Sequence, residues 1–218
     1  AFFLAAAGPA VANNLSDLNV SVMVELPTPK QGQFDVLSAT RGEGFSCQRY
    51  DRSGDSWPVE LLPNQSDSVE GGFLSLAKFC YPGKDFIANV EEALLDELYG
   101  LNKSEFLPVF DDQYISSGGQ LYELICGHDR FVGDFRASMY SLFRKQGRRS
   151  GQVCHPYDMA GVLIAEEAGV IVTSLKGTVF DAPLNTTAAV DWFGYSNASI
   201  RLEIEAKLQS ILADKLTL

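Results

Sequence analysis

The sequence predicts an α/β fold, a layered α/β sandwich with mixed sheets, from three observations. Strand-like segments at residues 20–26, 34–40 and 45–49 follow one another across short turns, which is typical of an antiparallel meander. Strand and helix patterns alternate in the second half of the chain. The 218 residues are 46% hydrophobic and 21% charged, which suits a globular protein with a substantial core.

The composition also narrows the classes of function. The net charge of −11 predicts no nucleic-acid partner, because such a partner needs a basic protein surface. Small anionic substrates are not excluded, since a bound metal can reverse the local charge. The four cysteines form no CxxC pair, so we expect reduced thiols in a cytoplasmic protein. Six Asn-x-Ser/Thr tripeptides matter only if the chain is secreted.

Residues 1–12, AFFLAAAGPAVA, allow two interpretations. The run resembles the apolar core of a secretory signal peptide that ends in a small-residue cleavage site. It lacks an initiating Met and a basic leader, however, and it is too short to span a bilayer. We therefore expect no membrane association, and we expect the sequence to begin inside a longer protein.

The rest of the first half of the chain is predicted to contain strands, a surface loop and a helix. Residues 20–26 place four aliphatic side chains on one face at period two, which predicts a strand. Residues 51–67 are polar with two prolines and predict a surface loop, and residues 72–79 predict another strand. Asp85 is expected to cap a helix whose apolar residues recur at helical spacing until Gly100.

In the second half, residues 106–115 are expected to be extended, and residues 116–119 to lead into a short helix. Residues 129–136 predict a strand that carries charges. Residues 137–152 contain the basic cluster of the chain: Arg144, Lys145, Arg148 and Arg149. A solvated loop is the simpler interpretation of this segment, and a lid that contacts a phosphate is the alternative.

The most distinctive stretch is a predicted buried helix at residues 156–168. Pro156 suits the first helical position, the following residues leave hardly any polar face, and Gly169 suits the end. A buried strand at 170–172 is expected next, then a strand at 189–195 and an amphipathic helix at 199–216. Asp158 is thus an acid in the first turn of an apolar helix. Its simplest role is to complement the helix dipole, worth less than about 1 kcal/mol.

Several motifs, taken in order, resemble the inositol monophosphatase family, which is grouped with fructose bisphosphatase and bisphosphate nucleotidase. The strongest is the C-terminal signature Asp158-Met159-Ala160-Gly161, Glu167-Ala168-Gly169 and Gly177-Thr178-Val179-Phe180-Asp181. Weaker matches are the strand 20–26, the hairpin Ala39-Thr40-Arg41-Gly42-Glu43-Gly44-Phe45 and the element Gly127-His128-Asp129-Arg130-Phe131. The resemblance covers essentially the whole chain and implies the layered sugar-phosphatase fold.

The resemblance implies a Mg²⁺-dependent phosphomonoesterase that acts on a small phosphorylated polyol, sugar or nucleotide, and it suggests a homodimer. Asp158 would be the last metal ligand, because hard cations hold phosphate oxygens and activate water in such sites. The residues expected to touch substrate are Ser117, Asp134, Arg136 and His155. Residues 1–110 would form part of an N-terminal antiparallel-sheet and helix layer, truncated at its start. Residues 111–218 would form a C-terminal α/β layer that carries Asp158.

The departures from the family pattern keep other functions open. The upstream Glu and the Asp-Pro-x-Asp-Gly-Thr metal motif are absent, so we expect residues 1–12 to lie just downstream of that motif and the segment alone to be inactive. Tyr157 stands where the family usually has Trp, and residues 137–152 resemble an insertion near the active-site entrance. The second hypothesis is a non-catalytic member or regulatory partner that keeps the fold. The third is a secreted binding module.

Overall fold

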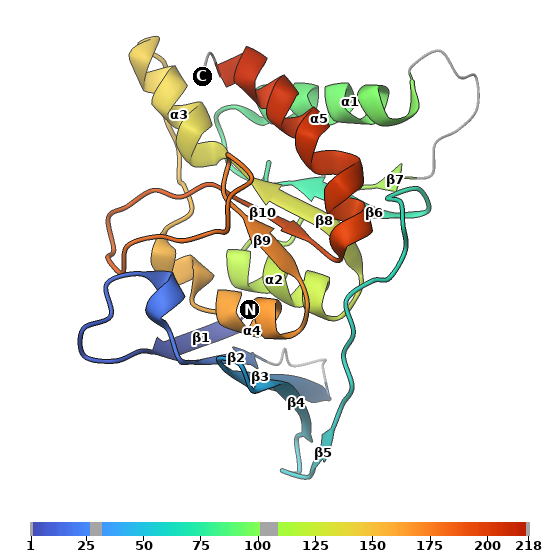
Figure 1. Cartoon of the computed structure of the whole chain (residues 1–218), viewed down its shortest axis with the longest axis vertical. Helices are drawn as coiled ribbons and strands as arrows, with labels where there is room; N and C mark the ends of the chain where they lie inside the picture. Colours follow the sequence, from blue (N-terminus) through green and yellow to red (C-terminus); the bar gives the residue numbers. More distant parts are fainter. Residues whose placement is uncertain (1, 27–31, 101–108, 217–218) are drawn as a thin grey trace.

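The computed structural model describes residues 2–26, 32–100 and 109–216, and it confirms the predicted layered α/β fold. Two five-stranded sheets alternate with two layers of helices, as Figure 1 shows. Helices α2 and α4 lie between the sheets, and α1, α3 and α5 cover the far face of the second sheet. None of the helices within the described ranges has the length and apolar character to cross a bilayer.

The elements of the first part are β1 (Phe2–Ala7), the short 3₁₀ helix η1 (Leu15–Asp17), β2 (Val20–Glu25), β3 (Gln33–Thr40), β4 (Gly44–Asp51) and β5 (Ser56–Pro58). The elements that follow are β6 (Gly72–Leu76), α1 (Lys84–Tyr99), β7 (Val109–Phe110), α2 (Ser117–Ile125), β8 (Asp129–Asp134), α3 (Arg136–Lys145), the 3₁₀ helix η2 (Pro156–Met159), α4 (Val162–Glu167), β9 (Ile171–Thr173), β10 (Trp192–Tyr195) and α5 (Ala198–Leu216).

The first sheet has the strand order β1-β2-β3-β4-β5, and every neighbouring pair is antiparallel. The meander predicted for residues 20–49 is therefore confirmed. The two edge strands were not predicted. Residues 2–7 form β1, and Trp57 lies in β5 within the segment predicted as a loop. Neither strand shows a clear alternation of apolar and polar residues. β1 is held by its pairing with β2, and β5 by its pairing with β4.

The buried face of β2 is not the aliphatic one. Ser21 and Met23 are fully buried, whereas Val22 and Val24 on the other face are only half-buried. Ser21 is tolerated inside because its hydroxyl donates to the carbonyl of Ala160 at 2.7 Å, so no buried polar group is left unpaired. The helical layer therefore packs on the Ser21 side, and the valines face outward.

The second sheet has the order β7-β6-β8-β10-β9 and is mixed. β6 runs parallel to β7 and β8, whereas β10 runs antiparallel to β8 and β9. The first sheet ends with β5 and the second begins with β6, so the chain passes between the two sheets in residues 59–71. Tyr122 of α2 donates to the buried Asp35 of β3 at 2.8 Å, which joins the helical layer to the first sheet.

Two predicted segments differ from the structure. Residues 136–145 form helix α3 instead of the expected loop and strand end, because Met139, Tyr140 and Phe143 make a buried stripe despite the charged residues around them. The predicted helix at 156–168 is divided into η2 and α4 at Gly161. Gly161 lies so close to β2 that an added Cβ would fall 2.7 Å from Met23 Cε.

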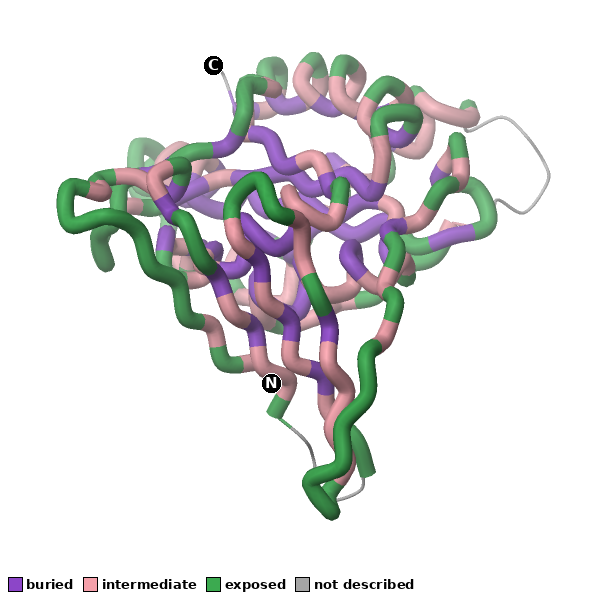
Figure 2. The backbone as a smooth tube through the Cα atoms, turned by 60° about the horizontal axis from the view of Figure 1, so that its bottom comes forward, coloured by how far each residue is buried: buried purple, intermediate pink, exposed green. Residues whose placement is uncertain are grey.

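The core consists of two clusters, one on each face of the second sheet, and Figure 2 shows the buried segments running through the middle of the molecule. The first cluster joins α2 and α4 to the first sheet, and the second joins α1, α3 and α5 to the second sheet. α1 is capped by Gly83, with a φ of +103°, and not by Asp85 as expected, which instead lies in the first turn. Of the five residues predicted for the site, Ser117 lies in α2, Asp134 and Arg136 lie where β8 leads into α3, and His155 and Asp158 lie at η2.

Candidate functional site

Asp158 lies in η2, where its carboxylate closes its own turn of helix. Asp158 Oδ2 accepts the backbone N–H of His155 at 2.9 Å, and the two residues form a capping box. His155 adopts an extended conformation as the N-cap residue, and Pro156 follows at the first helical position. The local sequence therefore uses Asp158 to satisfy a backbone donor that a helix start otherwise leaves unpaired.

A cleft of about 470 Å³ lies beside η2 and is bounded by the end of β1 and the loop that follows it. Its lining is uncharged throughout and includes Ala5, Ala6, Gly8 and Pro9 from the β1 side and Tyr157 from η2. Alanine, glycine and proline side chains offer no metal ligand.

The described residues do not assemble a group of several metal ligands at Asp158. Magnesium is held in proteins by one or two carboxylates together with water and substrate phosphates. Within the described ranges, Asp158 belongs to no group of three or more His, Cys, Asp or Glu side chains that could share an ion. Its own carboxylate is already engaged by the backbone of His155.

Asp134 and Arg136 form a buried ion pair at the junction of β8 and α3. Arg136 Nη2 donates to Asp134 Oδ2 at 2.6 Å and Arg136 Nε donates to Asp134 Oδ1 at 2.9 Å, with both side chains almost fully buried. Burial lowers the pKa of Arg136, but the Asp134 carboxylate outweighs burial and the pKa lies above its ordinary value. Arg136 also donates to the carbonyl of Gln152 and lies over the ring of Phe79. The charges of Arg136 and Asp134 therefore neutralise each other inside the protein.

Ser117 and His155 are likewise engaged within the protein. Ser117 is buried in the first turn of α2, and its hydroxyl lies 3.3 Å from the thiol of Cys154. His155 Nδ1 lies 2.7 Å from the carbonyl oxygen of Ala188, and its ring stacks on Tyr157 with 5.3 Å between ring centroids. Neither side chain lines the uncharged cleft.

Cys154, which was not predicted as a site residue, lies next to His155 and is 1% exposed. Its backbone bridges to Val190. Burial raises the pKa of its thiol far above the ordinary value, with a further contribution from the charge of Asp134 and a smaller one from Asp158. Its thiol is therefore held in the neutral form.

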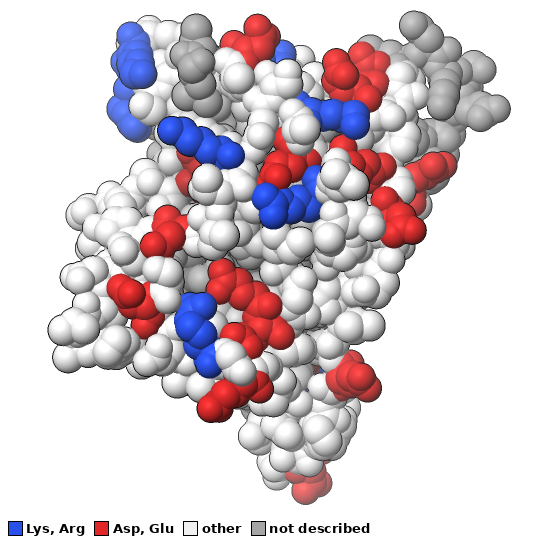
Figure 3. Space-filling model, viewed as in Figure 1, with Lys and Arg blue, Asp and Glu red and all other residues white. Residues whose placement is uncertain are grey.

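The basic cluster lies elsewhere. Arg144 and Lys145 are in the last turn of α3, and Arg148 lies over the ring of Phe143 with 3.5 Å to its centroid. Figure 3 shows basic side chains gathered over this end of α3, while acidic and basic side chains are interspersed on the rest of that face. None of the four basic residues lines the cleft beside Asp158. The lid hypothesis therefore gains no support from their position.

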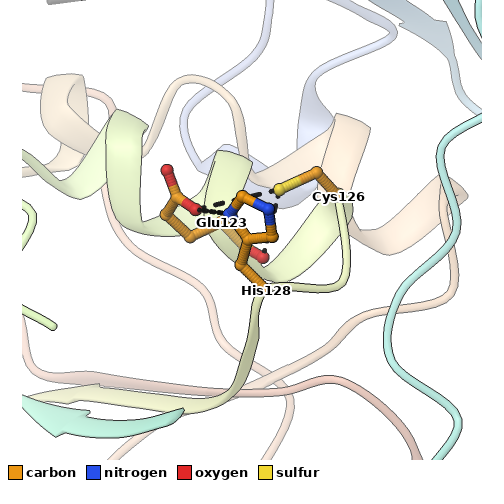
Figure 4. Close-up of side chains that lie close together, drawn as sticks. All are labelled: Glu123, Cys126 and His128. Carbon is orange, nitrogen blue, oxygen red and sulfur yellow. Dashed lines mark hydrogen bonds and ion pairs between the residues drawn. The ribbon is translucent and has the colours of Figure 1, made fainter. Parts of the chain in front are cut away.

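A second constellation, at the end of α2, was not found from the sequence. Glu123, Cys126 and His128 place one carboxylate oxygen, one sulfur and one ring nitrogen within 4.8 Å of one another (Figure 4). The next residue, Asp129, is 3% exposed. Burial, followed by the charges of Glu123 and Asp112, raises the pKa of the Asp129 carboxyl to about 7. The available signal was the spacing Glu-x-x-Cys-x-His.

No protein-family model and no curated protein sequence matches the chain. Solved structures do match it in fold. The inositol monophosphatase from Anabaena (Nostoc) sp. PCC 7120 is 15% identical with a TM-score of 0.52, covering 90% of this chain and 61% of that one. The Leishmania major fructose-1,6-bisphosphatase in its T-state is 12% identical with a TM-score of 0.56, covering 92% and 55%.

Mycobacterium tuberculosis SuhB gives a similar result, with 16% identity, a TM-score of 0.52 and coverage of 88% of this chain and 64% of that one. The chain therefore has the fold of these phosphatase structures and spans less than two thirds of the length of each. Identities of this size establish a shared fold and leave the chemistry to the residues of the site.

Proposed function

We propose that this chain is a non-catalytic protein built on the inositol monophosphatase fold, with a binding or regulatory role. The observation that carries the proposal is the cleft beside Asp158. Its β1 side presents Ala5, Ala6 and Gly8, and its lining is uncharged throughout. In this proposal the chain keeps the scaffold of the phosphatase structures without a metal site.

Phosphate-ester hydrolysis requires particular groups at the active site. Metal-dependent hydrolysis uses cations to hold phosphate oxygens, to activate a water and to neutralise the leaving oxygen. A carboxylate committed to capping its own turn, beside an apolar cleft, supplies none of these functions alone. A cleft without a charged side chain also does little to offset the cost of desolvating a phosphate. A ligand for this cleft would be uncharged and largely apolar, and the volume is in the range of small-molecule sites.

A second candidate is the Mg²⁺-dependent phosphomonoesterase that the motifs imply, acting on a small phosphorylated polyol, sugar or nucleotide. The position of Asp158 at a helix start, close to Ser117, Asp134 and Arg136 around Cys154, favours it. In this candidate Asp158 binds Mg²⁺ together with acids from outside the described residues. His155 would then contact substrate only after leaving its bond to the carbonyl of Ala188.

The two candidates are separated by phosphate release. The wild-type chain and Asp158→Asn are assayed with and without Mg²⁺ on a phosphorylated polyol, a sugar phosphate and a nucleoside phosphate. The non-catalytic proposal predicts that neither protein releases phosphate above the buffer rate. Mg²⁺-dependent release by wild type that Asp158→Asn loses would establish the second candidate. Thermal melting of both proteins checks that the substitution leaves the fold intact.

The cytoplasmic location and the homodimer remain proposals that rest on the resemblance and on the cysteines. Cys47, Cys80, Cys126 and Cys154 are all free thiols, which agrees with a reducing compartment. Analytical ultracentrifugation at several protein concentrations tests the homodimer, and a single monomeric species would contradict it.

A further inference from the structure

The backbone at the end of α2 brings together three side chains that can bind a metal, those of Glu123, Cys126 and His128. The N–H of Cys126 donates to the carbonyl of Tyr122 and that of His128 to the carbonyl of Glu123, so the chain folds back over the last turn of the helix. Gly127 makes this turn with a φ of +81°, where an added Cβ would fall 2.6 Å from the carbonyl oxygen of Leu62. The backbone therefore fixes the positions of the Cα atoms that carry the three side chains.

The side chains also point toward one another (Figure 4). His128 Nδ1 lies 2.6 Å from Glu123 Oε2, and Cys126 Sγ lies 3.8 Å from the same oxygen. In a tetrahedral zinc site with bonds of about 2.0–2.3 Å, neighbouring ligand atoms lie roughly 3.3–3.8 Å apart. Small side-chain rotations would bring the nitrogen and the oxygen to that separation, without movement of the backbone.

We propose that Glu123, Cys126 and His128 form a Zn²⁺-binding site. Sulfur, imidazole nitrogen and carboxylate oxygen are the ligands that zinc takes in proteins, whereas Mg²⁺ prefers oxygen alone. Three protein ligands leave a fourth position for water or for a group from a binding partner. The side chain of His128 is 72% exposed, so the open position faces solvent.

The simpler interpretation is an exposed Glu–His ion pair beside a thiol that fills the end of the helix. Such a pair contributes less than about 1 kcal/mol and does not require sulfur next to the same oxygen. The surroundings favour a cation. Asp129, the residue directly after His128, is a further acidic side chain at this place and is buried. The negative local charge attracts a divalent metal.

The test is a titration of the full chain, stripped of metal with a chelator under reducing conditions, with Zn²⁺ by calorimetry and with Co²⁺ by absorption. We expect one equivalent to bind, and Co²⁺ to show a thiolate charge-transfer band together with tetrahedral d–d bands. Cys126→Ser and His128→Gln should each weaken Zn²⁺ binding by more than about tenfold. Cys126→Ser should also abolish the charge-transfer band.

Cys80→Ser is the matched control, because Cys80 is also a partly buried free thiol but lies outside the cluster. It should bind Zn²⁺ like wild type. Absence of one-equivalent binding, equal affinity in all three variants, or a charge-transfer band that survives Cys126→Ser would each overturn the proposal. Circular dichroism of each variant confirms that loss of binding is not loss of fold. The readout is metal affinity, so the result is independent of phosphatase activity.

Discussion

The start of η2 and the end of α2 both bring ionisable side chains to a helix terminus, yet they differ in what those side chains do. Asp158 in η2 accepts the N–H of His155, and its neighbours Pro156 and Tyr157 line an uncharged cleft. At the end of α2, Glu123, Cys126 and His128 direct their ligand atoms toward one another. A residue at a motif position therefore indicates chemistry only when its neighbours converge on the same point, and here the convergence lies outside the motif.

The buried pair of Asp134 and Arg136 gives the sharpest test of whether the motif residues are structural. Arg136→Met should lower the free energy of unfolding by about 3–5 kcal/mol, because it leaves the Asp134 carboxylate buried without its partner. Urea denaturation measures the loss. Arg144→Met, in the last turn of α3, is the control and should change stability by less than about 0.5 kcal/mol. Equal stability of wild type and Arg136→Met would mean that Arg136 is free for another role.

At the end of α2, next to His128, Asp129 should make the free energy of unfolding depend on pH. Its pKa of about 7 in the folded chain lies above the unfolded value, so the folded state holds the proton more tightly between about pH 4 and pH 7. Stability from this group is present at low pH and is lost as the pH rises through that window. In chelator-treated protein, Asp129→Asn should match wild type near pH 4. It should exceed wild type by up to about 4 kcal/mol near pH 8. A constant difference across this range contradicts the assignment.

The smallest expected effect concerns Asp158 itself. If its carboxylate serves as a cap, Asp158→Ala should destabilise the fold by about 1 kcal/mol, and Asp158→Asn, which keeps an acceptor oxygen, by much less. Chemical denaturation of the two variants measures the difference. Unchanged or increased stability of Asp158→Ala would show that the carboxylate is held at a cost, as expected of a group kept for binding.

Much of the fold could be predicted because its strands and long helices have clear periodicity. The pattern of apolar and polar residues gave the wrong prediction where two signals competed. Residues 136–145 carry enough charge to look like a loop, although Met139, Tyr140 and Phe143 bury one side of α3. In β2 both faces carry apolar side chains, so the choice of Ser21 and Met23 as the buried face depended on α4 packing there, which no local pattern contains.

The site roles that the resemblance implies for Ser117, Asp134, Arg136 and Asp158 stay predictions, for a related reason. Whether a polar side chain is free or already paired depends on contacts between distant segments. Examples are the approach of Ser117 to Cys154 and of His155 to the carbonyl of Ala188. The α2 cluster was missed although its residues are local, because the turn at Gly127 brings them together.

The measurement that tests the central claim most directly is Mg²⁺ binding to the full chain by titration calorimetry, compared between wild type and Asp158→Asn. Asp158 as a helix cap beside an uncharged cleft predicts the same weak, non-saturating heats for both proteins. A saturable Mg²⁺ site in wild type that disappears in Asp158→Asn would contradict the account and restore Asp158 as a metal ligand.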